Sequence, residues 1–122
     1  MNIWLAVFLG GGLGSISRFG VSALTTNNFK HIKPEATLIS NVLATIVLGI
    51  LLYYFHEKYT LSDSYKAFLI TGFCGGFSTF STFSYETIEL IKHHSYFYGT
   101  VNIVISLALS IFALILISKF VN

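Results

Sequence analysis

Four long apolar stretches, nearly free of charged residues, dominate this sequence. A helix needs about 20 mainly apolar residues to cross a bilayer core of roughly 30 Å. Four segments meet this requirement, at about residues 2–24, 35–56, 66–88 and 95–119. Over the whole chain 54% of residues are hydrophobic and 10% are charged, against about 25% charged in a soluble domain. The pattern predicts an all-α membrane protein, with the 122 residues forming a single domain of four transmembrane helices.

Charge and cysteine content exclude several classes of function. The net charge is only +2, and no basic run is present that could neutralise a phosphate backbone, so nucleic acid is not expected as a partner. Cys74 is the single cysteine, and no set of Cys and His has the spacing of metal ligands. No nucleophile, base and orienting acid can be assembled either, so the chain is not expected to be an enzyme.

The lysines between the stretches are evenly divided. The termini and the middle loop carry Lys58, Lys66 and Lys119, whereas the first and third loops carry Lys30, Lys33 and Lys92. Orientation in a membrane normally follows an excess of Lys and Arg on one side. With no excess, we predict that the chain inserts both ways and that opposite copies pair. The alternative is that the N-terminal amine or another local signal fixes one direction.

The small size of the chain also favours a dimer. Four short helices leave almost no protein to surround a polar path across the bilayer, and a second copy would supply the missing wall. An antiparallel pair has a two-fold axis in the membrane plane, so any path through it occurs twice.

Polar residues recur at helical spacing within two of the stretches. Thr37 and Asn41 are four residues apart in the second, and Asn102, Ser106 and Ser110 recur every four residues in the fourth. Each set therefore shares one helical face. Such residues commonly form hydrogen bonds between transmembrane helices, and they also line polar paths. Both interpretations remain open for each set.

The third stretch contains the least regular segment, which runs from Gly72 to Phe83. Adjacent glycines lower helix stability, and the Ser and Thr residues that follow can bond to local backbone, which predicts a break near residues 75–79. Broken backbone at membrane depth is tolerated where it is buried or lines a cavity, and its free carbonyls suit a small hard cation. The alternative is that the glycines allow close helix packing.

Phenylalanine alternates with hydroxyl residues after these glycines. Phe80 and Phe83 share a helical face, and Ser81, Thr82 and Glu86 lie around them. Phenylalanines in a membrane helix usually only pack. The positive edge of an aromatic ring can also contact an anion, and nearby hydroxyl donors could replace part of its hydration shell.

Arg18 is the one charged residue within the first stretch. It is either an interfacial anchor that reaches the membrane surface or a vestibule cation that attracts anions. The glycine run at residues 10–14 lacks the Lys-Ser/Thr ending of a phosphate loop, and we expect it to permit close helix approach.

Together these motifs resemble the Fluc (CrcB) family of bacterial fluoride channels. The resemblance rests on Gly10-Gly11, Gly14 and Arg18, on Thr37-Leu38 with Asn41, and on Gly72 through Phe83. It implies an antiparallel, dual-topology homodimer in the cell inner or plasma membrane. It also implies a passive, fluoride-selective channel, through which fluoride leaves the cytoplasm and its toxicity is limited.

The resemblance also implies roles for individual residues. The backbone carbonyls of Gly75 and Ser78 would hold a structural Na⁺ shared by both copies. The fluoride pore would be lined by Asn41, Phe80, Phe83 and Ser110 together with Thr37, Ser81, Thr82 and Glu86, and Arg18 would lie in the vestibule. Three positions depart from common family residues: Ser78, where many relatives have the first of two threonines, Ala44, where a glycine is common, and Val104, near a position that is tyrosine in some relatives. They affect details of the pore and leave the assignment unchanged.

Two other functions remain as alternatives. A small proton-coupled multidrug exporter needs a carboxylate in the first stretch, which has none. Proton-coupled export of fluoride would use Glu86 as the carrier. A scaffold subunit that conducts nothing is a third class, and a fluoride efflux assay distinguishes all of these.

Overall fold

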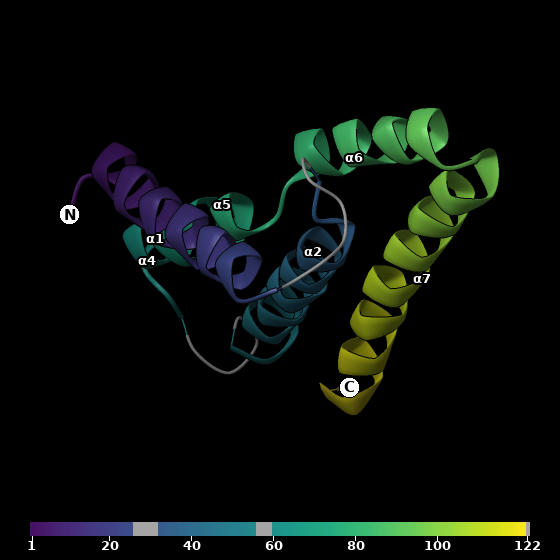
Figure 1. Cartoon of the computed structure of the whole chain (residues 1–122). Coiled ribbons are helices and arrows are strands. Elements are labelled where there is room, and N and C mark those ends of the chain that lie inside the picture. Colours follow the sequence, from purple (N-terminus) through teal and green to yellow (C-terminus); the bar gives the residue numbers. More distant parts are fainter. Residues whose placement is uncertain (26–31, 56–59, 122) are drawn as a thin grey trace.

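The structure, a computed structural model, describes residues 1–25, 32–55 and 60–121 and is helical throughout most of them (Figure 1). Its elements in chain order are α1 (Ile3–Leu24), α2 (Pro34–Gly49), the π-helical η1 (Ile50–Phe55), α4 (Asp63–Lys66), the π-helical η2 (Ala67–Cys74), α5 (Gly75–Phe77), α6 (Phe80–His93) and α7 (Tyr96–Val121). The described residues contain no strand, so the all-α prediction is confirmed for them. Lys30 and Lys58, two lysines of the charge balance, lie outside the described residues.

Three of the four predicted stretches form continuous helices that are long and apolar enough to cross a membrane: α1, α2 with η1, and α7. Local capping explains where two of them begin. The side chain of Asn2 accepts a hydrogen bond of 2.7 Å from the amide of Trp4 at the start of α1. Pro34 occupies the first turn of α2, where its missing N–H costs nothing.

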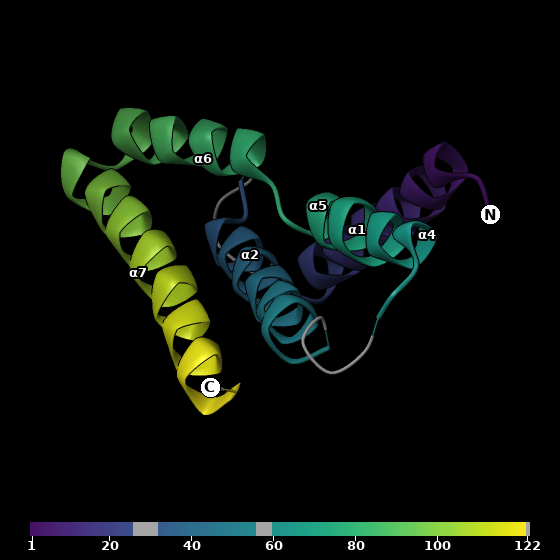
Figure 2. The ribbon, with the colours of Figure 1, turned by 180° about the vertical axis from the view of Figure 1, so that it is seen from behind.

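The remaining stretch is broken, as predicted. Helical backbone runs from α4 through η2 and α5 to Phe77, and Ser78 and Thr79 are then extended, with φ/ψ of −85°/156° and −153°/119°. The hydroxyl of Thr79 caps the new helix α6 by accepting from the amide of Thr82. The two parts diverge at the break, because α5 lies beside α1 whereas α6 extends across the ends of α2 and α7 (Figures 1 and 2).

Glycines bring α1 into direct backbone contact with η2 and α5. A Cβ atom on Gly10 or Gly14 would overlap backbone of η2, and one on Gly76 would meet the backbone of Gly11. The expected close approach through the 10–14 glycine run is therefore confirmed. Of the third-stretch glycines, Gly72 also packs against α1, but a Cβ on Gly75 would meet nothing within 4 Å. Close packing thus accounts for part of this glycine cluster and not for Gly75.

A second group of contacts joins α7 to α2 and α6. Gly49 of α2 faces Leu114 and Ile117 of α7. The amide of Asn102 on α7 donates a hydrogen bond of 2.9 Å to the hydroxyl of Thr87 on α6. Asn102 thus acts as helix-to-helix glue, one of the two roles that its spacing allowed.

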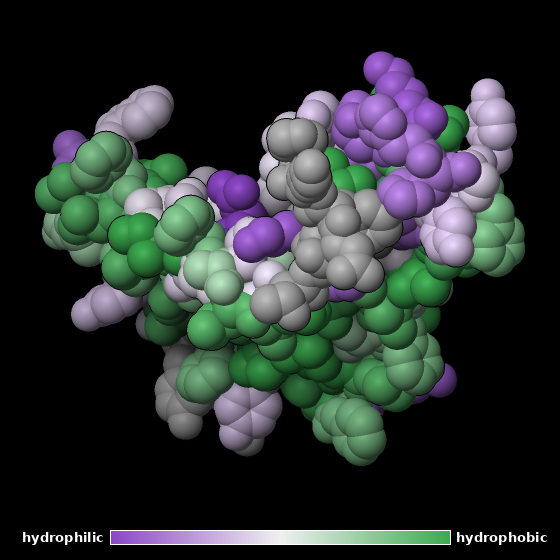
Figure 3. All heavy atoms as spheres, in the orientation of Figure 1, coloured by the Kyte–Doolittle hydropathy of each residue, from purple (hydrophilic) through white to green (hydrophobic). Residues whose placement is uncertain are grey.

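Large apolar side chains remain exposed along the helices. Trp4, Phe8 and Phe19 on α1 are 84%, 74% and 74% exposed, and α7 exposes many aliphatic residues. Figure 3 shows hydrophobic residues over most of the lower part of one face, with hydrophilic residues gathered near α6. Monomeric soluble proteins rarely expose this much contiguous apolar surface, so these faces suit lipid or another protein.

Candidate functional site

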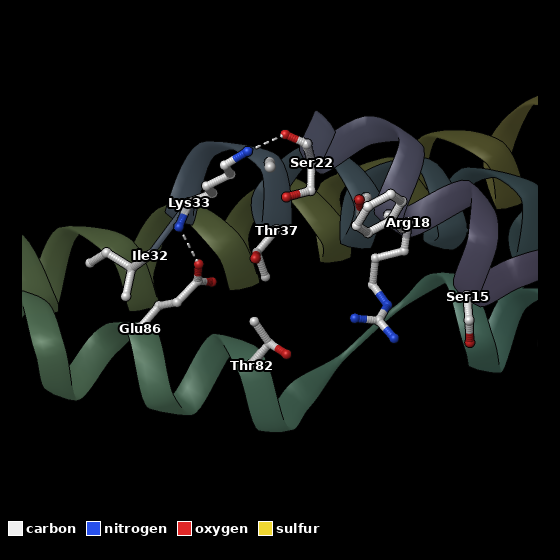
Figure 4. Close-up of a pocket in the computed structure, with 11 residues that line it drawn as sticks. Ser15, Arg18, Ser22, Ile32, Lys33, Thr37, Thr82 and Glu86 are labelled. Carbon is white, nitrogen blue, oxygen red and sulfur yellow. Dashed lines mark hydrogen bonds between the residues drawn. The ribbon is translucent and has the colours of Figure 1, made fainter. Parts of the chain in front are cut away.

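A polar cavity of about 450 Å³ lies where α1, the start of α2 and α6 meet (Figure 4). Four of the predicted site residues line it: Arg18, Thr37, Thr82 and Glu86. They come from three helices, and only the fold brings them together. This polar pocket is the candidate site.

Glu86 lies at one side of the polar pocket and is 3% exposed. Its Oε2 atom accepts a hydrogen bond of 2.7 Å from the backbone amide of Lys33, directly before α2 begins. A carboxylate at a helix N-terminus is favoured by the helix dipole. Oε1 of Glu86 is buried and has no hydrogen-bond partner among the described residues. Glu86 therefore both fixes the start of α2 and presents an unpaired oxygen.

Lys33 joins this carboxylate to the end of α1. Its Nζ donates a hydrogen bond of 2.7 Å to the carbonyl of Ser22, in the last turn of α1. A cation at a helix C-terminus is favoured by the dipole. One residue thus holds the end of α1, the start of α2 and a carboxylate of α6 at the same wall of the polar pocket (Figure 4).

Arg18 links the polar pocket to the broken helix. Its Nε donates a hydrogen bond of 3.2 Å to the carbonyl of Gly76 in α5, and its guanidinium points toward the segment that joins α5 to α6 (Figure 4). This bond places positive charge in the polar pocket close to the break. The two sequence-based roles for Arg18 stay predictions, and the structure adds a contact with the backbone beside the break.

Asn41 forms two hydrogen bonds to the backbone of Thr79, at the break. Its Oδ1 accepts from the amide of Thr79 at 2.7 Å, and its Nδ2 donates to the carbonyl of Thr79 at 3.2 Å. In a continuous helix the Thr79 amide would donate to the carbonyl of Gly75. The Thr82 amide, which would donate to Ser78, bonds instead to the Thr79 hydroxyl at 3.2 Å. The carbonyls of Gly75 and Ser78 have therefore lost their helical donors.

A smaller cavity of about 220 Å³ lies at these two residues, between α2 and the end of η2, and Cys74 and Thr45 also line it. Its lining includes no charged residue. The Ser78 hydroxyl donates to the carbonyl of Cys74 at 2.9 Å and is therefore engaged within the helix. The two oxygen atoms at this cavity that lack a helical donor are the backbone carbonyl oxygens of Gly75 and Ser78.

The remaining predicted residues lie outside the polar pocket. The rings of Phe80 and Phe83 have centroids 5.9 Å apart at 40°, and Phe80 is 78% exposed. Ser81 is exposed, and its hydroxyl is 3.3 Å from that of Thr79. Ser110 is half-buried on α7. A single chain therefore assembles only part of the predicted set.

Sequence reasoning missed four polar residues of the pocket: Ser15, Ser22, Lys33 and Ser40. Ser40 is three residues after Thr37, and this spacing alone would have placed the two on one helical face. Lys33 was counted only as a loop charge. Its bond to Glu86 joins residues 53 positions apart, and no local pattern shows such a contact.

The helices, the exposed apolar faces and the polar pocket define an all-helical, multi-pass membrane protein. The chain belongs to the family described as "CrcB-like protein, Camphor Resistance (CrcB)", whose model matches residues 5–117. The family expected from the sequence motifs is therefore confirmed.

Curated relatives match almost the full chain. The "Fluoride-specific ion channel FluC 1" of Yersinia pestis is 38% identical over 99% of this chain and 98% of its own length. A "Fluoride-specific ion channel FluC" of Clostridium perfringens is 36% identical, over 94% of this chain and 90% of its own. That of Thermococcus kodakarensis is 37% identical, over 91% and 89%. These relatives are named as ion channels, which agrees with the expectation that the chain is not an enzyme.

Proposed function

We propose that this protein is a fluoride-selective channel that lets fluoride leave the cytoplasm passively and so limits its toxicity. The observation that carries the proposal is the polar pocket, in which Arg18 and several hydroxyl groups meet beside a broken helix. Relatives named as fluoride-specific channels support the choice of ion.

The chemistry of fluoride fits such a pocket. Fluoride is small and strongly hydrated, so a pore must replace its water with closely placed donors, whereas larger halides fit the same narrow site poorly. Arg18 attracts the anion to the pocket. The hydroxyl of Thr82 lies in the lining as a donor, and so does that of Thr37, which also interacts with the Glu86 carboxyl. Asn41, Phe80, Phe83, Ser81 and Ser110 would continue the path beyond it.

The path would be completed by a second copy in the opposite orientation. Phe80 is exposed in the single chain, and so are the apolar faces of α1 and α7. Residues of the predicted pore that lie outside the polar pocket would then be enclosed by the partner. The balanced lysine count supports insertion in both directions.

Gly75 and Ser78 fit a structural Na⁺ at the centre of this dimer. Their carbonyls have lost their helical donors, and Gly75 faces open space, where a second copy could approach. Neutral carbonyl oxygens are suitable ligands for a hard cation. When bound, the ion would link the broken helices of the two copies.

Purified protein in liposomes should dissipate a fluoride gradient and pass little chloride, because the pore donors suit only the smaller anion. A fluoride electrode measures the efflux after a potassium ionophore is added to carry the compensating charge. Protein-free liposomes are the control. No fluoride efflux from liposomes that contain folded protein would exclude the channel and leave the scaffold alternative.

Proton-coupled fluoride export is the second candidate, and the buried, unpaired Oε1 of Glu86 favours it. The same liposomes distinguish the two functions. Efflux through a channel follows an imposed membrane potential, whereas coupled export follows an imposed pH gradient at zero potential.

Sodium replacement tests the proposed cation site. Protein purified and reconstituted with N-methylglucamine as the only cation should show slower fluoride efflux than protein kept in Na⁺, because the carbonyls of Gly75 and Ser78 would lack their ligand. Both samples are assayed with a proton ionophore in place of the potassium ionophore to carry the compensating charge. Returning Na⁺ should restore the rate, and returning choline, which is too large for the site, should not. Equal rates with and without Na⁺ would refute the site and leave the proposed ion selectivity untouched.

A further inference from the structure

Two buried side-chain atoms have no hydrogen-bond partner among the described residues: Ser40 Oγ and Glu86 Oε1. Both residues line the polar pocket. Buried polar atoms in folded proteins are nearly always hydrogen-bonded, and leaving one unpaired costs free energy. Their coincidence in one cavity indicates that the cavity holds something polar.

The Ser40 hydroxyl differs from other hydroxyls of this chain. A serine or threonine inside a helix can donate to the carbonyl four residues earlier. Helical hydroxyls do so at Ser17, Thr45, Ser84 and Thr87, with distances of 2.7–2.9 Å. Ser40 is 1% exposed and makes no such bond. The Ser40 hydroxyl therefore has no acceptor among the described residues, and the residue lines the polar pocket.

The occupant that suits this donor is a small anion. Arg18 supplies positive charge to the polar pocket, and Thr37, about one helical turn before Ser40, places a second hydroxyl on the same side of α2, where it also interacts with the Glu86 carboxyl. A hydroxyl donates a short hydrogen bond to an anion. The unpaired Glu86 oxygen can only accept while it is ionised, so it would pair with water and not with the anion.

We propose that Ser40 is a further anion-binding residue of the channel, whose hydroxyl donates a hydrogen bond to fluoride in the polar pocket beside Arg18 and Thr37. The inference rests on the proposed function and adds a residue to its ion path.

Ser40→Ala tests the inference, because it removes the donor and leaves the helix intact. Loss of one hydrogen bond to an ion should raise the half-saturating fluoride concentration about tenfold. Initial efflux rates from liposomes at several fluoride concentrations measure it. The thermal unfolding temperature should stay the same or rise, since an unpaired buried hydroxyl is removed. Ser40→Cys, a weaker donor of similar size, should give an intermediate value.

Ser17→Ala is the matched control, because its hydroxyl bonds to the Leu13 carbonyl at 2.9 Å and lies outside the polar pocket. It should keep the wild-type fluoride dependence. An unchanged half-saturating concentration in Ser40→Ala would overturn the inference and indicate that water alone satisfies the hydroxyl. A lower unfolding temperature with unchanged fluoride dependence would also overturn it. If wild-type protein passed no fluoride, the proposed function would fail as well.

Discussion

Phe83→Ile and Phe80→Ile should each lower fluoride efflux about tenfold, which corresponds to about 1.4 kcal/mol of lost stabilisation for the ion. Isoleucine keeps an apolar side chain of similar bulk but has no aromatic edge to contact an anion. The two rings lie 5.9 Å apart on α6, so both can face one path. Efflux from liposomes, measured with a fluoride electrode at equal protein content, checks the expected loss.

The exposure of Phe80 makes this test informative. Its side chain is 78% exposed in the single chain, so its replacement removes little packing within the chain and should leave folding intact. Phe112→Ile on α7 is the control, since that ring is 57% exposed and lies outside the predicted pore. Wild-type efflux in both α6 variants would eliminate the aromatic role, and an equal loss in the Phe112 variant would show that the loss is not specific to the predicted pore.

The helices and their break were predictable because their causes are local. Apolar stretches long enough to span a bilayer mark α1, α2 with η1, and α7. The glycines at 75 and 76 with the hydroxyl residues after them weaken the helix at a definite place. The structure puts the extended residues at Ser78 and Thr79, at the end of the predicted interval. The π-helical segments η1 and η2 were not predicted, since no local pattern distinguishes them from α-helix.

The site was predictable where its residues carry polar groups within apolar segments and match the motifs of the family. Arg18, Thr37, Thr82 and Glu86 stood out on that basis, and the fold places all four in one cavity. The backbone amide of Lys33 bears no signature in the sequence, because its importance comes from a carboxylate far away in the chain. The roles of Phe80, Ser81 and Ser110 depend on a second copy, and those roles remain predictions.

Asn41→Ala should have the other large effect, because Asn41 holds the break open. The substitution removes two hydrogen bonds to the backbone of Thr79. Bonds between membrane helices are worth about 0.6 kcal/mol on average, with a maximum near 1.7, so we expect a loss of about 1–2 kcal/mol in the free energy of unfolding. The freed Thr79 amide can then return to the carbonyl of Gly75, its partner in a continuous helix.

A continuous helix would remove the break between α5 and α6, and it would engage the Gly75 carbonyl of the proposed cation site. Fluoride efflux should therefore fall more than tenfold, which corresponds to about 1.4 kcal/mol or more of lost stabilisation for the ion. Asn102→Ala is the matched control, since it removes one side-chain hydrogen bond to Thr87 and leaves the contacts at the break unchanged. It should lose about half as much stability and keep most of the efflux. Thermal unfolding in detergent and electrode-measured efflux report the two effects separately. If Asn41→Ala conducted like wild type, the break would not depend on this amide; a loss of efflux as large in Asn102→Ala would point to general destabilisation instead of the Thr79 contact.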